Sequence, residues 1–141
     1  MVRSAFAALI GVVVGAVIVF LVERTGHAFF PAPADFDPSS AAAVAALPLG
    51  TKLSVLAAWF AGAFGGGAAA ALAARRWAPA AWVVAMTILL LAGTSLAAIA
   101  HPLWMAVGAV LATVLGGWLS VKTTDARYGA PPAAAQRKGL I

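Results

Sequence analysis

Four long runs of apolar residues, each ended by charged residues or by proline, set out the plan of this chain. The runs cover roughly residues 5–22, 53–74, 79–100 and 103–121, so each holds about 18 to 22 residues. A helix of about 18 residues rises roughly 27 Å, close to the roughly 30 Å hydrocarbon core of a bilayer. The pattern therefore predicts four transmembrane helices that form one domain over residues 1–121.

The longest polar stretch, residues 25–51, separates the first two runs. Asp37-Pro38 within it is typical of a helix start, with Asp as the N-cap and Pro in the first helical position. A short helix over residues 39–46 would end before Pro48 and cannot span the membrane, so we expect it to rest at the membrane surface or on the bundle. The predicted fold is all-α: a four-helix transmembrane bundle with a short interfacial helix in the first outward loop.

A cleaved secretory signal peptide is the alternative for the first run. Arg3 fits the basic region of such a peptide, and Ala32-Pro33-Ala34 has small residues at the cleavage spacing. The apolar run is longer than that of a usual signal peptide, however, and charged residues lie between it and the cleavage site. We therefore expect the first run to remain as a transmembrane helix.

Composition makes lipid the expected solvent for most of the molecule. Of the 141 residues, 64% are hydrophobic and 9% are charged, whereas a soluble domain carries roughly a quarter charged residues. The absence of cysteine excludes disulfides, thiolate chemistry and cysteine-ligated metals. The net charge of +5 lies at the ends of the apolar runs and in the tail, which indicates orientation in a membrane and not nucleic-acid binding.

The basic residues predict how the chain is oriented. Seven of them fall on one side of the predicted membrane and two, Arg24 and Lys52, on the other. By the positive-inside rule both termini are then cytoplasmic. We expect residues 122–141 to form a flexible basic cytoplasmic tail. The seven residues are Arg3, Arg75, Arg76, Lys122, Arg127, Arg137 and Lys138.

Small residues recur at four-residue spacing within the runs, which is typical of close contact between membrane helices. The glycine-rich stretch 62–68 is not a phosphate-binding loop, because no strand precedes it and no Gly-Lys-Ser/Thr follows. We expect small residues of all four helices to pack against neighbouring helices. They are Gly11, Gly15, Gly62, Gly66, Gly93, Gly108, Ala112 and Gly116.

A polar cluster is predicted at the outward ends of the helices. Glu23 and His27 lie one helical turn apart, with Arg24 beside them, and His101 lies in the only other turn on that side. If Glu23, His27 and His101 converge, they could bind zinc or another divalent ion. The alternative is that they anchor helix ends at the interface. A haem held by the two histidines fits less well, because both lie in boundary segments.

Several function classes follow with different support. No ionisable side chain is predicted near the membrane centre and no motif pairs a nucleophile with a base, so we expect neither an enzyme nor a cofactor. The leading hypothesis is a non-enzymatic packing or interaction module, either a homo-oligomer or an accessory subunit of a membrane complex. The alternatives are a homo-oligomeric transporter or channel for a small solute or ion, and an outward site for a metal or a lipid headgroup. A transport path would be lined by Thr87, Thr94, Ser95 and Thr113.

Several short motifs follow one another along the first three quarters of the chain: Glu23-x-x-Gly26-His27, Phe30-Pro31, Leu47-Pro48-Leu49-Gly50, Ala58-Trp59, Gly62-Ala63, Gly65-Gly66 and His101-Pro102-Leu103-Trp104. Their order resembles that of small, uncharacterised bacterial membrane proteins with four transmembrane helices. The resemblance covers most of the chain up to Trp104 and implies a bacterial cytoplasmic (inner) membrane location and a four-span fold, but no activity. Small multidrug transporters are similar in size, yet they need a membrane-embedded carboxylate in the first helix, whereas Glu23 is predicted at the helix end.

Overall fold

The computed structural model describes residues 2–129, with the side chains described from Ser4 onward. Within this range the chain forms five α-helices and no named strand, which confirms the predicted all-α class. Four of them are long and apolar enough to cross a membrane, as predicted. The helices are α1 (Val2–Phe29), α2 (Ala41–Ala46), α3 (Leu49–Ala73), α4 (Ala78–Ala98) and α5 (Leu103–Thr123).

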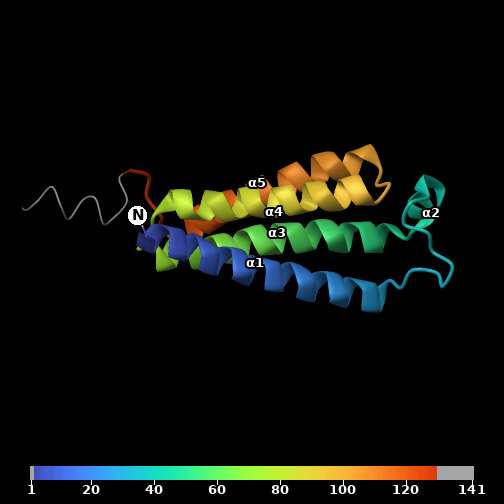
Figure 1. Cartoon of the computed structure of the whole chain (residues 1–141), viewed down its shortest axis with the longest axis horizontal. Helices are drawn as coiled ribbons and strands as arrows, with labels where there is room; N and C mark the ends of the chain where they lie inside the picture. The colour runs from blue at the N-terminus through green and yellow to red at the C-terminus, as the bar shows by residue number, and fades with distance from the viewer. Residues whose placement is uncertain (1, 130–141) are drawn as a thin grey trace, which may run out of the picture.

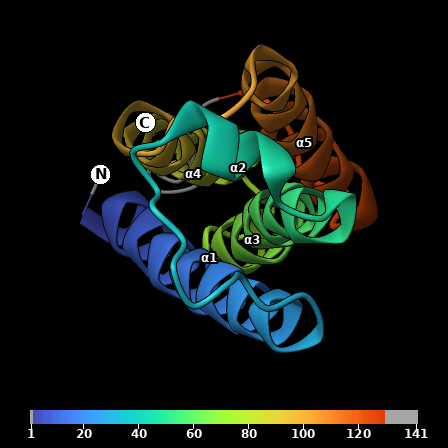
Figure 2. The same ribbon diagram turned by 90° about the vertical axis from the view of Figure 1, so that its right-hand side faces the viewer.

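The four long helices lie side by side, with α3 in contact with each of the other three (Figure 1). Seen along the bundle, α1 and α5 lie on opposite sides of the α3–α4 pair (Figure 2). One end of the bundle carries α2 and the α4–α5 turn, and we call it the cap end. The other end carries the α3–α4 turn and residues 124–129, and we call it the tail end.

Glycines let α1 and α3 approach each other closely. A Cβ added at Gly66 would lie 2.5 Å from the carbonyl oxygen of Gly11 and 2.8 Å from the Cα of Gly15. A Cβ added at Gly15 would lie 2.9 Å from the carbonyl oxygen of Gly62. Real side chains do not come this close to backbone atoms, so two small-residue faces on antiparallel helices meet backbone to backbone.

The same principle governs the contact between α3 and α5. A Cβ at Gly116 would lie 2.7 Å from the Phe60 carbonyl oxygen, and one at Gly108 would lie 2.8 Å from the Leu56 side chain. Ala112, between them in the repeat, is half-buried. Gly117, which the repeat did not single out, faces α4, where an added Cβ would lie 2.8 Å from that of Ala85.

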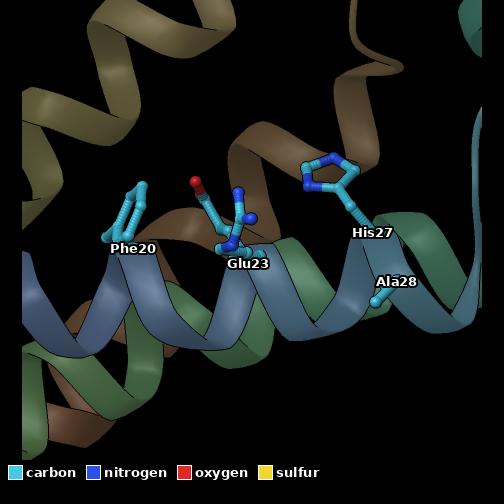
Figure 3. A pocket seen from close by; sticks show the side chains of 5 residues that line it. Phe20, Glu23, His27 and Ala28 are labelled. Atoms are coloured by element: carbon cyan, nitrogen blue, oxygen red, sulfur yellow. The ribbon is translucent and has the colours of Figure 1, made fainter.

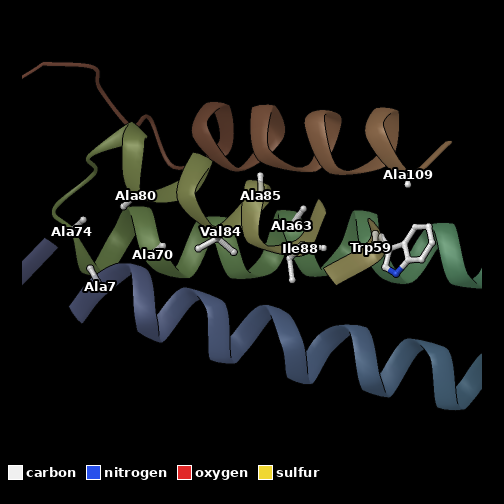
Figure 4. Packing of buried hydrophobic residues seen from close by; sticks show 11 residues of the cluster. Ala7, Trp59, Ala63, Ala70, Ala74, Ala80, Val84, Ala85, Ile88 and Ala109 are labelled. Carbon is white, nitrogen blue, oxygen red and sulfur yellow. The ribbon is translucent and has the colours of Figure 1, made fainter. Parts of the chain in front are cut away.

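The prediction for Gly93 is wrong. This residue is exposed on α4, and a Cβ added there would meet no atom within 4 Å. The core face of α4 is formed instead by residues such as Val84, Ile88 and Ala92, all fully or almost fully buried (Figure 4). Gly93 follows Ala92 directly, and a step of one residue turns a helical side chain by about 100°. Gly93 therefore points away from the core.

The cap end is closed by α2, which lies across it in Figure 2. Its N-cap is Ser40, whose hydroxyl accepts a hydrogen bond from the backbone N–H of Ala43 at 3.3 Å, and not Asp37 as predicted. The Asp37 carboxylate instead accepts from the backbone N–H of Ser39 at 2.9 Å, which delays the helix start. Val44 is fully buried beneath the cap, so this short helix rests on the bundle.

Lys52 stabilises the C-terminal end of α2. Its Nζ donates to the carbonyl oxygens of Ala45 at 2.7 Å and Leu47 at 3.0 Å. These carbonyls lie where a helix runs out of intrahelical donors, and a cation is favoured there by the helix dipole. The lysine is itself buried, so the cap and the start of α3 share one polar anchor.

The last described residues contact the tail end of the bundle. Helix α5 continues to Thr123, and the next residues fold against the α3–α4 turn. The Arg127 N–H donates to the Arg76 carbonyl at 2.7 Å, and the Ala78 N–H donates to the Arg127 carbonyl at 3.0 Å. The indole N–H of Trp82 donates to the Tyr128 hydroxyl at 2.8 Å. Residues 124–129 therefore contact the α3–α4 turn, whereas residues 130–141, with Arg137 and Lys138, lie outside the described part, and the flexible tail stays a prediction.

Candidate functional site

The first span was predicted to end at Val22, but helix α1 continues to Phe29. Glu23 thus lies well inside the helix, roughly 9 Å below its last residue at 1.5 Å per residue. The continuation keeps Glu23 and His27 on one face, and Figure 3 shows Phe20, Glu23 and His27 projecting to the same side of α1. This is the predicted i, i+4 relation between the carboxylate and the imidazole.

An open pocket of about 450 Å³ lies over this face of α1. Glu23 is half-buried, whereas Arg24 and His27 are exposed. None of the three side chains makes a hydrogen bond or an ion pair to another residue within 2–129. The polar groups of Glu23, Arg24 and His27 are therefore available to a ligand in the pocket. The pocket is lined by Phe20, Glu23, Arg24, His27 and Ala28 (Figure 3).

A second cavity of about 260 Å³ runs from this pocket toward the interior, between α1 and α4. The two cavities adjoin each other, because Phe20 and Glu23 line both, and we call them together the α1–α4 groove. Most of the lining of the second cavity is apolar, and Trp59 of α3 lies against it. Its lining residues are Ala16, Val19, Phe20, Glu23, Trp59, Ile88, Leu91 and Ser95.

Two further polar groups of the groove lack a protein partner. The Trp59 side chain is only 3% exposed, yet its indole N–H makes no hydrogen bond within residues 2–129, unlike those of Trp77 and Trp82. In Figure 4 its indole nitrogen lies on the ring edge turned toward α1. The Ser95 hydroxyl, on the α4 wall, likewise has no hydrogen bond to a described residue. Among the described residues only the two ring nitrogens of His101 are both fully buried and unpaired, so the Trp59 and Ser95 donors stay accessible to a ligand that carries acceptors.

His101 does not belong to this site. It lies in the α4–α5 turn, whose Ala100 N–H donates to the Pro38 carbonyl at 3.3 Å. Burial lowers the pKa of His101 from its ordinary value, and the nearby ammonium of Lys52 lowers it further. Both ring nitrogens are enclosed by protein and have no hydrogen-bond partner in the described part of the chain.

The predicted metal set is therefore wrong. No three His, Cys, Asp or Glu side chains between Ser4 and Gly129 lie where they could hold a metal ion together. Glu23 and His27 face the groove, whereas His101 lies in the α4–α5 turn, close to Lys52 of α3. The enclosed nitrogens of His101 also leave no ring atom free to bind the iron of a haem, so the haem alternative has no support.

The four hydroxyls expected along a transport path do not share one surface. Thr87 donates to the Val83 carbonyl and Thr113 to the Ala109 carbonyl, each at 2.8 Å, as is common for hydroxyls in membrane helices. Thr94 likewise bonds back within α4 and is exposed, whereas Thr113 is buried on α5. Of the four residues, only Ser95 lines the groove.

Comparison with known proteins adds no assignment: no family model, no curated protein and no solved structure matches the chain. The resemblance to small four-span bacterial membrane proteins is untested by these comparisons and stays a prediction. The features of the molecule that bear on its function are the α1–α4 groove and the surfaces that the helices leave exposed.

Proposed function

We propose that this membrane protein binds an amphipathic lipid in the α1–α4 groove. The observation that carries the proposal is that a mainly apolar cavity adjoins a polar mouth, with Phe20 and Glu23 lining both. A lipid has the same division, with an apolar chain joined to a polar headgroup. The groove also lies between two helices that expose large apolar side chains, so a lipid can enter sideways from the bilayer.

The polar groups lie at positions where such a ligand has polar atoms. The glycerol-ester region of a phospholipid lies directly below its headgroup and carries carbonyl acceptors. The Trp59 N–H and the Ser95 hydroxyl are donors within the groove, and Glu23, Arg24 and His27 stand at its mouth. A bound lipid would supply acceptors to the two donors, Trp59 and Ser95, that have no partner among the described residues.

The other hypotheses have less support. The predicted packing faces on α1, α3 and α5 are occupied by contacts within this chain, so they no longer argue for self-association or for a partner subunit. A transport path has no continuous polar lining among the hydroxyls expected to form it. Lipid binding requires neither a catalytic group nor a metal.

The cap end is proposed to face outward from a bacterial cytoplasmic membrane, with both termini inside. The tail end carries Arg75, Arg76, Lys122 and Arg127, as the positive-inside rule requires of the cytoplasmic side. A single cysteine replacing the exposed Ser39 should then react with an impermeant thiol reagent added to intact cells. Protection of that cysteine in intact cells and reaction only after lysis would reverse the orientation.

Filling the groove tests the proposal. Ala16 lines it, so Ala16→Phe should occupy the space of an acyl chain and lower the bound lipid by about tenfold, a change of 1.4 kcal/mol. Native mass spectrometry of protein purified in mild detergent measures the lipid retained. Val13→Phe is the matched control, because Val13 is exposed on the same helix and lines neither part of the groove. Equal retention by the two variants, or a wild-type protein that carries no lipid, would contradict the proposal.

A further inference from the structure

We infer that the α1–α4 groove selects a zwitterionic aminophospholipid, whose headgroup joins a primary ammonium to a phosphate. The inference rests on the proposed function and concerns the charges at the mouth of the groove. Glu23 is negative and Arg24 is positive, so the mouth carries one charge of each sign. A headgroup of balanced charge matches it better than a headgroup with a net negative charge.

Burial distinguishes the two charged side chains. Glu23 is half-buried and lines both parts of the groove, whereas Arg24 is exposed and lines only the open pocket. The carboxylate is therefore the charge closest to the bound chain. It would repel the phosphate of an anionic lipid, and it would attract an ammonium that folds back toward the groove. Arg24 and His27 remain at the open pocket to donate to the phosphate.

Hydrogen bonding separates a primary ammonium from a quaternary one. The Glu23 carboxylate has no donor within residues 2–129, so its oxygens are free to accept. A primary ammonium supplies three N–H donors, as a lysine side chain does, and forms charge-assisted hydrogen bonds. A choline headgroup has the same charge but no N–H group. The geometry thus points to ethanolamine-type lipids, ahead of choline-type lipids and well ahead of anionic glycerol-type lipids.

The experiment is a competition between lipids that differ only in headgroup. The purified full-length protein is exchanged into detergent with equal amounts of phosphatidylethanolamine, phosphatidylcholine and phosphatidylglycerol with identical acyl chains. Native mass spectrometry then measures which lipid stays bound. We expect the ethanolamine lipid to exceed the choline lipid by about tenfold, which is 1.4 kcal/mol and close to the usual range for a hydrogen bond to a charged group.

Variants assign the preference to the carboxylate. Glu23→Gln should still retain lipid but lose the preference for ethanolamine over choline, whereas Glu23→Asp keeps the charge and should keep a preference. Asp125→Asn is the matched control, because it removes the same charge from an exposed side chain at the tail end. It should leave the preference unchanged.

The two proposals fail in different ways. Retention of all three lipids in equal amounts, or enrichment of phosphatidylglycerol, would overturn the headgroup inference and leave lipid binding intact. An unchanged preference in a folded Glu23→Gln protein would also overturn it. Retention of none of the lipids by the wild-type protein would overturn the proposed function itself.

Discussion

Replacing Gly66 with leucine should prevent α1 from docking on α3 and lower the free energy of unfolding by more than about 3 kcal/mol. Even the first carbon of the new side chain would lie 2.5 Å from the Gly11 carbonyl oxygen and 2.8 Å from the Gly15 Cα. Both are backbone atoms of a facing helix, so no rotamer change relieves the overlap. The helices must separate, and the contact that close approach makes possible is lost along their length.

Gly93→Leu is the matched control for this prediction. It makes the same chemical change in the middle of another long helix, at a site where an added Cβ meets nothing within 4 Å. Thermal unfolding in detergent, followed by size-exclusion chromatography, measures both variants. We expect Gly93→Leu to melt close to the wild type and Gly66→Leu to melt far below it. Equal melting temperatures for the two variants would show that the α1–α3 contact contributes little.

Replacing Lys52 with methionine should open the cap end. The substitution keeps an unbranched side chain but removes the donor to the carbonyls of Ala45 and Leu47. Hydrogen bonds to charged groups contribute about 2 kcal/mol each, so loss of this anchor should make opening of α2 at least about thirtyfold more frequent. Val44, the fully buried residue of α2, reports the opening when it is replaced by cysteine, because the chain has no cysteine of its own.

The rate at which an impermeant maleimide modifies Val44→Cys is the measurement. It should rise in the Lys52→Met background and stay unchanged with Lys122→Met, which removes an exposed lysine from the other end of the bundle. A cysteine at the exposed Ser39 should react equally fast in all three backgrounds and corrects for access of the reagent. If Val44→Cys reacts at the same low rate with and without Lys52, other contacts hold the cap.

Most of the fold follows from patterns that depend on local physics. Apolar runs long enough to cross a bilayer predict the four long helices, and four-residue spacing predicts that Gly62 and Gly66 face a neighbour. Spacing does not tell which neighbour a small residue meets. Gly93 was therefore predicted to pack although it is exposed, and Gly117 was missed although it contacts α4.

The wrong N-cap prediction for α2 and the unpredicted contacts of residues 124–129 have a related cause. Ser40 and Asp37 are both good capping residues, and the choice depends on the local bond from Ser39 to Asp37, which uses the Asp37 carboxylate. The ordering of residues 124–129 depends on hydrogen bonds to the distant α3–α4 turn. Such long-range partners leave no periodic signal in the sequence.

The site was half predictable. Glu23 and His27 lie four residues apart, so any helix brings them to one face, and Figure 3 shows that arrangement. His101 was expected to join them because it lies at the same end of the bundle, but helices at one end can face different neighbours, and His101 lies beside Lys52 instead. The sequence does not predict that Trp59 and Ser95 line a cavity with Glu23, since only the packing of three helices brings these residues together.

Photocrosslinking in the membrane tests lipid binding in the α1–α4 groove most directly. A phosphatidylethanolamine with a photoreactive diazirine on its acyl chain is added to membranes that contain the wild-type protein, irradiated, and the adducts are mapped by peptide mass spectrometry. We predict that adducts concentrate on Ala16, Val19, Trp59, Ile88 and Leu91, which line the groove, and that excess unlabelled lipid removes them. Adducts spread evenly over exposed residues such as Leu9, Leu90 and Leu103, with no loss on competition, would mean that lipid only surrounds the bundle and that the groove is not a binding site.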